Sequence, residues 1–249
     1  MVFPDFTDPS VWLSLLTLTF LEIVLGVDNI IFISILSGKL SPKEQKRART
    51  IGLLLAMIFR VALLLAITWI MQLKEPLFKM PFIKDAGEPL FISWKDLILM
   101  AGGIFLVVKS TLEIHHKLES QNTVGVKPKS HSGLLSIILQ IVLIDAVFSF
   151  DSILTAIGLV EEVAIMIIAV VISILLMIVF AGRISRFINN NPTLQMLALS
   201  FLIVIGVMLV AEGFHQKISK SYIYTMIAFS LLVELLNMRL RKNSDSEKN

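Results

Sequence analysis

Residues 22–30 of this chain read EIVLGVDNI, and residues 145–153 read DAVFSFDSI. The two segments align without gaps, and each has a carboxylate, a second carboxylate six residues later, and then a small polar residue. The matched positions are Glu22 with Asp145, Asp28 with Asp151, and Asn29 with Ser152. Both copies lie inside long apolar runs, where an ionised side chain is costly and indicates a functional site. The motifs therefore predict a polytopic membrane protein whose buried acids bind and move a cation.

The composition supports a chain that lies mostly in lipid. Of its 249 residues, 56% are hydrophobic and 16% are charged, whereas a soluble domain carries about 25% charged residues. There is no cysteine, which excludes disulfides and thiolate metal sites. The net charge of +3 is small, and the basic residues do not alternate with aromatic residues, so no nucleic-acid partner is expected.

Seven segments have the ~20 mostly apolar residues that a spanning helix needs. They are residues 11–37, 51–73, 96–114, 133–158, 163–182, 194–213 and 222–240. Pro9 and Ser10 favour a helix start before the first segment, and residues 191–193 favour one before the sixth. The predicted fold is an all-α membrane protein, with one transmembrane domain over residues 1–249. A polar tail at 243–249 follows the seventh segment.

The motif copies fall in the first and fourth helices, which implies two repeats of three helices. Because three is an odd number, the second repeat must run opposite to the first. This inverted arrangement is common in secondary transporters and places the site near mid-membrane, where the repeats meet. Repeat one covers about 10–116, repeat two covers about 133–215, and the seventh helix at about 222–240 stands outside the duplication.

Basic residues in the loops predict the orientation. Loops 39–50 and 115–132, the link after the fifth helix and the tail hold more lysine and arginine than the connections on the other side, among them loop 74–95. The positive-inside rule therefore puts the N-terminus outside and the C-terminus in the cytoplasm. Loop 74–95, which is rich in proline, is expected to be an ordered external excursion.

The buried acids need a partner. One acid at a helix centre costs about 2.5–3.5 kcal/mol, which a cation, protonation, an arginine or a water-filled cavity must offset. Two inverted motifs bring four carboxylates towards one axis, and a divalent ion there would relieve their repulsion. Oxygen ligands suit Mg²⁺, Ca²⁺ or Mn²⁺, among which the residues do not choose. A helix break at Gly26 would let Glu22 and Asp28 converge with freed carbonyls.

The motifs EIVLGVDN and DAVFSFDS, together with VELLNMR at 233–239, resemble the TerC family of integral membrane proteins. That family is named for tellurium resistance, is implicated in Mn²⁺ export, and is related to the lysine-exporter-like superfamily of three-plus-three helix transporters. The resemblance covers essentially the whole chain and implies manganese efflux across a bacterial inner membrane. On the family pattern, the expected metal site is Glu22, Asp28, Asn29, Asp145, Asp151 and Ser152.

Several residues have two interpretations. The motif acids bind metal, or they form a polar network that holds the first and fourth helices together. Arg60, mid-span in the second helix, is a counter-ion of the empty site or a fixed salt bridge. Glu212 is an exit ligand or a solvated helix end. Glu234 and Asn237 share one face of the last helix and extend the pathway or cap an interface.

The leading function is a secondary transporter that exports a hard divalent cation, Mn²⁺ first, with Mg²⁺ and Ca²⁺ not excluded. There is no Walker-type loop, so ATP is not expected to be the direct energy source. There is no HExxH and no Ser/His/Asp set at membrane depth, so an enzyme is not expected. The alternative is a membrane protein that binds metal without transporting it and acts as a handover partner or sensor. Tellurium resistance is then indirect, since an anion is a poor ligand for carboxylates. Small-residue faces allow a homodimer without establishing it.

Overall fold

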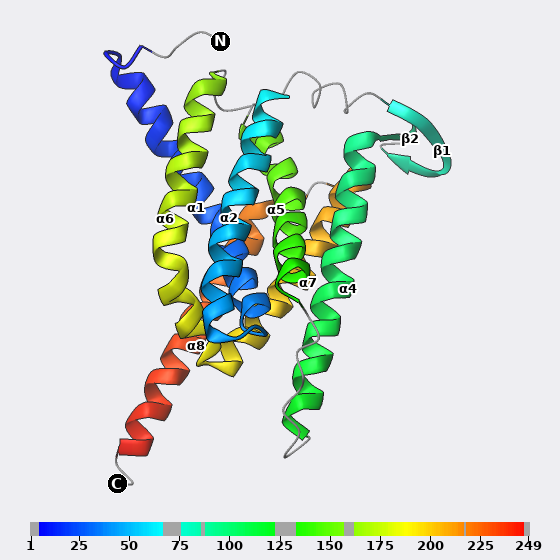
Figure 1. The fold of residues 1–249 in the computed structure, drawn as a ribbon. Helices are drawn as coiled ribbons and strands as arrows, with labels where there is room; N and C mark the ends of the chain where they lie inside the picture. The colour runs from blue at the N-terminus through cyan, green and yellow to red at the C-terminus, as the bar shows by residue number, and fades with distance from the viewer. Residues whose placement is uncertain are drawn as a thin grey trace.

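The computed structural model describes residues 5–66, 76–85, 88–122, 133–156, 162–216 and 218–246. These residues form seven helices and one antiparallel hairpin (Figure 1). The helices are α1 Pro9–Ser37, α2 Pro42–Leu65, α4 Trp94–Asn122, α5 Leu134–Ala156, α6 Val163–Asn189, α7 Pro192–Gly213 and α8 Lys220–Ser246. The strands are β1 Pro76–Asp85 and β2 Glu88–Ser93. The prediction of an all-α membrane protein with seven helices is confirmed.

The helices have the length and composition of membrane spans. Six of the described helices are long and apolar enough to cross a bilayer. The described apolar part of α5 is shorter, at residues 134–150, and α5 packs among α1, α2 and α4. Helix α1 begins and α8 ends at opposite ends of the bundle, as an odd number of crossings requires (Figure 1).

Two of the helix starts follow from the sequence. Asp8 caps α1, because its Oδ1 accepts a 2.8 Å hydrogen bond from the Ser10 amide, and Pro9 begins the helix without needing a partner for an N–H. Asn191 and Pro192 occupy the corresponding positions at α7. Both predicted entries are confirmed.

The helices extend further than their apolar segments. The second helix begins at Pro42 rather than at residue 51, so most of the basic loop 39–50 lies on α2. The fifth helix continues past residue 182 to Asn189, and the last one reaches Ser246, inside the expected tail at 243–249. Charged turns prolong these helices beyond the apolar part that hydropathy detects. The end of the second segment, 67–73, lies outside the described residues.

Loop 74–95 contains the hairpin. Strand β1 pairs with β2 from Pro76 opposite Ser93 to Asp85 opposite Glu88, with two irregularities in register. Leu90 and Ile92 of β2 are buried, and β2 contacts the start of α4. The described residues of this loop, 76–85 and 88–95, are therefore ordered, as expected, but the strands were not predicted.

Helices pair across the two halves of the chain. Helix α1 packs most extensively on α6, α2 on α5, and α4 on α7. Each pair joins one helix from the first three with one from the next three. Gly26 of α1 faces Met177, and Gly38, the residue after α1, faces Asn189, so α1 and α6 run parallel.

The contact between α4 and α7 is reciprocal. A Cβ placed on Gly103 would lie 2.5 Å from the carbonyl oxygen of Gly206, and a Cβ on Gly206 would lie 2.8 Å from that of Gly103. Gly103 also meets Val210, while Gly206 meets Val107. The two helices therefore cross antiparallel about equivalent glycines. Parallel pairing of α1 with α6 and antiparallel pairing of α4 with α7 are what two inverted three-helix repeats produce.

Candidate metal site

The polar residues of the two motifs form one stripe on each helix. Positions four and then three residues apart lie on the same helical face. On α1 the stripe is Glu22, Gly26 and Asn29, and on α5 it is Asp145, Ser149 and Ser152. All six residues are buried, although five of them are polar. The stripes therefore face the protein interior and not lipid.

Arg60 of α2 joins the acids of the two stripes. Its Nη1 donates to Glu22 Oε2 at 2.5 Å, while its Nε and Nη2 donate to Asp145 Oδ2 and Oδ1 at 3.0 and 2.8 Å. Arg60 is 2% exposed, and both acids are 4% exposed. Charge-assisted bonds in this bidentate geometry are among the strongest that side chains form. One guanidinium thus holds the first carboxylate of each motif.

Asn29 and Ser149 complete the surroundings of Asp145. Asn29 Nδ2 donates to Asp145 Oδ1 at 3.0 Å, and Ser149 Oγ donates to Asp145 Oδ2 at 3.0 Å. Asn29 Oδ1 is buried and accepts no hydrogen bond from any described residue. Thr19 Oγ1, one turn before Glu22, is also buried and makes no hydrogen bond to any described residue. Buried oxygens that find no partner, as these find none among the described residues, are rare, and here they lie on the helical face that carries Glu22.

These oxygens fit a hard cation. Carboxylate, amide and hydroxyl oxygens are the ligands of Mg²⁺, Ca²⁺ and Mn²⁺, and among the described side chains Glu22, Asp145 and Arg60 sum to one negative charge. Among those side chains, no group of three or more His, Cys, Asp or Glu is positioned to hold a metal. Arg60 occupies the acids instead.

The structure assembles part of the predicted site. Glu22, Asn29 and Asp145 meet at Arg60. Ser152 Oγ donates to the carbonyl of Ser149 in its own helix, at 3.2 Å, so it lies on the stripe without bonding to the acids. Asp28 and Asp151 are in α1 and α5, but their side chains lie outside the described residues.

The break expected at Gly26 is not present. Helix α1 is continuous from Pro9 to Ser37. Gly26 instead admits α6, because Met177 Sδ would lie 2.6 Å from a Cβ placed there. The glycine serves close helix packing, which small residues provide in membranes. The acids therefore converge through packing of whole helices and not through unwound backbone.

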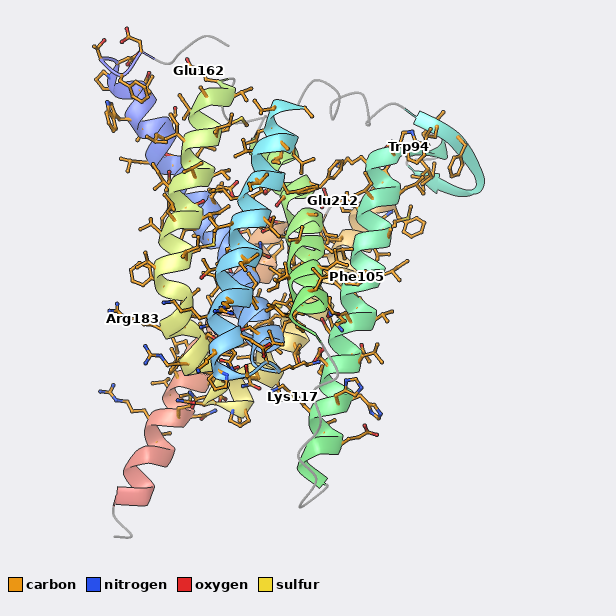
Figure 2. The ribbon with its side chains drawn as sticks, viewed as in Figure 1. Trp94, Phe105, Lys117, Glu162, Arg183 and Glu212 are labelled. Atoms are coloured by element: carbon orange, nitrogen blue, oxygen red, sulfur yellow. The ribbon has the colours of Figure 1, made fainter. Side chains whose placement is uncertain are left out.

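The remaining candidates lie apart from Arg60. Glu212 forms a 3.6 Å ion pair with Lys95, and Figure 2 places it towards the end of the bundle that carries Trp94. Glu234 and Asn237 are on α8, which packs mainly on α7. Asn237 is exposed, whereas Glu234 is half-buried and its Oε1 accepts no hydrogen bond within the described part of the chain.

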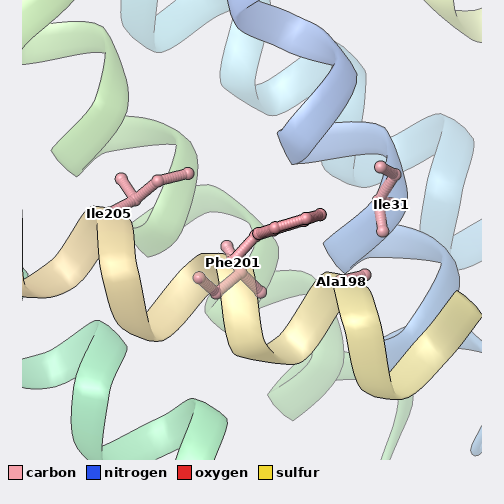
Figure 3. A pocket seen from close by; sticks show the side chains of 5 residues that line it. Ile31, Ala198, Phe201 and Ile205 are labelled. Atoms are coloured by element: carbon pink, nitrogen blue, oxygen red, sulfur yellow. The ribbon is translucent and has the colours of Figure 1, made fainter. Parts of the chain in front are cut away.

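A small pocket between α1 and α7 does not contribute to the site. Ile31 lines it from α1, and Ala198, Phe201, Leu202 and Ile205 line it from α7 (Figure 3). All five side chains are apolar, so they offer a cation no ligand.

Ser149 was not predicted as a site residue, although it aligns with Gly26 in the duplicated motif. A serine four residues after a buried aspartate is within reach of its carboxylate on the same helical face, and this spacing was the available signal. Met177 carried no such signal, because its place opposite Gly26 depends on how α6 packs.

Comparison with known proteins agrees with this architecture. Residues 7–249 match the model of the integral membrane protein TerC family. A UPF0053 protein of Haemophilus influenzae is 42% identical over 241 residues, which is 97% of this chain and 99% of that protein. The UPF0053 inner membrane protein YoaE of Escherichia coli K12 is 44% identical over 236 residues, covering 95% of this chain and 44% of YoaE. A UPF0053 protein of Buchnera aphidicola from Schizaphis graminum is 44% identical over 238 residues, covering 96% and 45%.

The chain thus spans less than half the length of the YoaE and Buchnera relatives, and nearly all of the Haemophilus one. No solved structure matches it. The family match extends over the motif helices, the crossing glycines and the last helix alike. With its seven-helix membrane fold, this chain belongs to the TerC family of integral membrane proteins.

Proposed function

We propose that this protein is a secondary transporter that exports a hard divalent cation, Mn²⁺ first, through the carboxylates at the repeat interface. The observation that carries the proposal is the meeting of Glu22 and Asp145, the first acids of the two inverted motifs, in the protein interior. Acids in a spanning segment indicate ion pathways, and a site between inverted repeats is the plan of many secondary transporters.

The described residues have distinct roles in this proposal. Glu22 and Asp145 supply charge to the cation. Asn29 adds a neutral oxygen, and its Oδ1 is buried and accepts nothing from the described residues. Asp28 and Asp151 are proposed as further ligands on the family pattern. No catalytic role is proposed for any residue, and tellurium resistance is proposed to be an indirect result of metal handling.

The proposed location is a bacterial inner membrane, with the N-terminus outside. The name of the relative YoaE includes the words inner membrane protein, which supports the location. Basic residues support the orientation: in Figure 2, Arg183 and Lys117 lie towards the end where α8 finishes, and Glu162 lies at the opposite end. Positive charge gathers on the cytoplasmic side.

The test is flux in liposomes loaded with a Mn²⁺-sensitive dye. Asp145→Asn keeps the shape of the side chain and removes its charge, so we expect metal-dependent flux to fall to the level of empty liposomes. Asp28→Asn and Asp151→Asn are expected to act likewise. Glu119→Gln is the matched control, because Glu119 pairs with His115 on the exposed end of α4, and its flux should equal that of the unchanged protein.

The outcomes separate the proposal from its alternative. Flux that is lost in the motif variants and kept in the control supports a transporter. Folded protein that binds Mn²⁺ but gives no flux would identify a handover partner or sensor. Flux that persists in Asp145→Asn would remove the repeat interface as the site.

A further inference from the structure

We propose, on the basis of the proposed function, that Arg60 is a tethered counter-cation. It occupies the carboxylates of Glu22 and Asp145 when no metal is bound, and the metal must displace it. The sequence left two interpretations of Arg60, a counter-ion of the empty site and a permanent structural salt bridge. The proposal adopts the first and rejects the second. The consequence is that the guanidinium and the transported cation bind in turn to the same oxygens.

The geometry makes binding of both cations unfavourable. The guanidinium covers both oxygens of Asp145, at 3.0 and 2.8 Å, and one oxygen of Glu22, at 2.5 Å. These are oxygens that a divalent ion would use. A second cation beside a buried guanidinium would also meet direct repulsion, which the low dielectric strengthens.

The charges favour exchange. With Arg60 in place, the two acids and the guanidinium sum to one negative charge among the described side chains. With a divalent ion in place of the guanidinium, the two acids and the ion sum to zero. Either occupant compensates the acids, whereas an empty pair would leave two buried charges unpaired, which is strongly unfavourable.

The repeats differ at this position. Helices α2 and α5 run parallel, and Gly52 of α2 faces Ile141 of α5. Eight residues further along each helix, Arg60 therefore lies at the same height in the bundle as Ser149. On the other parallel pair, Met177 faces Gly26, the residue that aligns with Ser149. Met177 is therefore the repeat equivalent of Arg60.

Because of this difference, the Arg60 guanidinium is a counter-cation that the two motifs share. A thioether carries no charge, so at the position of Met177 the second repeat supplies no counterpart to the guanidinium. One arginine serves the first acid of both motifs. A salt bridge that only tied one pair of helices together would not need to reach both halves of the duplication.

The test is Mn²⁺ binding by purified Arg60→Met, which places the residue of the second repeat in the first. We expect the dissociation constant to fall about tenfold or more, because the metal no longer displaces charge-assisted hydrogen bonds. Added Mn²⁺ should also raise the melting temperature of Arg60→Met more than that of the unchanged protein. Arg49→Met is the matched control on α2: Arg49 bonds to serine hydroxyls, with Ser185 Oγ at 3.2 Å, so its loss should leave Mn²⁺ affinity unchanged.

The results decide between the two interpretations. If Arg60→Met binds Mn²⁺ no more tightly than the unchanged protein, or more weakly, Arg60 is a structural bridge and the inference is overturned. If Arg60→Met does not fold, Arg60→Lys decides between the two interpretations, since lysine keeps the charge but loses the bidentate fork. The affinity of Arg60→Lys for Mn²⁺ should be higher than that of the unchanged protein, and a lower affinity overturns the inference. If the unchanged protein itself binds no divalent metal, the proposed function fails as well. Failure of the inference alone leaves wild-type binding and flux intact.

Discussion

An alanine at Gly103 should force α4 and α7 apart. The added Cβ would lie 2.5 Å from the carbonyl oxygen of Gly206, 2.8 Å from a methyl of Val210 and 2.9 Å from its amide nitrogen. Real Cβ atoms essentially never come closer than 3.0 Å to such neighbours. Two of the three obstacles belong to the backbone of α7, so a change of side-chain rotamer cannot remove the clash and the helices themselves must move.

The size of the effect follows from that movement. Restoring a contact of 3.0–3.4 Å requires a shift of about 0.5–0.9 Å along the contact, and overpacking a tight core costs about 1–3 kcal/mol. We expect Gly103→Ala in the upper half of this range. Gly206→Ala makes the reciprocal contact, and the double variant should cost less than the sum, because one methyl has already opened the crossing.

Thermal unfolding in detergent, followed as the folded fraction on size-exclusion chromatography, measures the effect. Gly182→Ala is the control, since a Cβ there meets nothing within 4 Å; because alanine also favours a helix interior over glycine, its melting temperature should not fall. Gly102→Ala should fall between the two, because its obstacle is the side chain of Val147, and Val147→Ala should relieve it. If Gly103→Ala has the same melting temperature as Gly182→Ala, the close crossing of α4 and α7 is refuted.

Three further predictions concern the ends of the helices. Ser93→Ala removes the hydroxyl from the capping box that begins α4, in which this hydroxyl accepts from the Asp96 amide and the Ser93 amide donates to Asp96 Oδ2. The loss of the hydroxyl should cost about 0.5–2 kcal/mol, and unchanged thermal unfolding would contradict it. Glu113→Gln should cost about 1–3 kcal/mol, because this buried carboxylate holds Lys39 at 2.5 Å and so ties the turn after α1 to α4; a melting temperature equal to wild type would argue against the tie. As the chain has no native cysteine, single cysteines can be placed at Thr7 and Ser244 and labelled with an impermeant thiol reagent. The cysteine at Thr7 should react in intact cells, and the cysteine at Ser244 should react only in inside-out vesicles. Labelling of both from one side would contradict an odd number of crossings.

The helices could be predicted because length and apolarity alone are enough to identify a spanning segment. Their ends could not, for the same reason. Turns such as the start of α2 at Pro42 are charged and lie beyond the apolar stretch, so hydropathy treats them as loop. The hairpin was missed because its ten- and six-residue strands contain prolines, which sequence patterns associate with loops.

The sequence predicted which acids form the candidate site but not how the surrounding helices pack around them. The duplicated motif indicates that Glu22 and Asp145 approach one axis, since repetition and inversion are both visible along the chain. Which acid Arg60 would bind depends on α2 packing against α5, and no local pattern encodes that pairing. Gly26 shows the same limit: glycine permits both a broken helix and a close contact, and only the position of Met177 decides for the contact.

The repeats are most informative where they differ. Two identical inverted halves would give outward-open and inward-open states of equal energy, because the pseudo-two-fold axis exchanges them. Arg60 on α2 and Met177 on α6 remove that equality, since only one half carries the counter-cation. A rearrangement that moves α2 away from α5 withdraws the guanidinium from Asp145, whereas the equivalent movement of α6 away from α1 withdraws only a thioether from Gly26. We therefore expect Arg60→Met, which restores the symmetry, to bring the two states closer in energy as well as to strengthen metal binding.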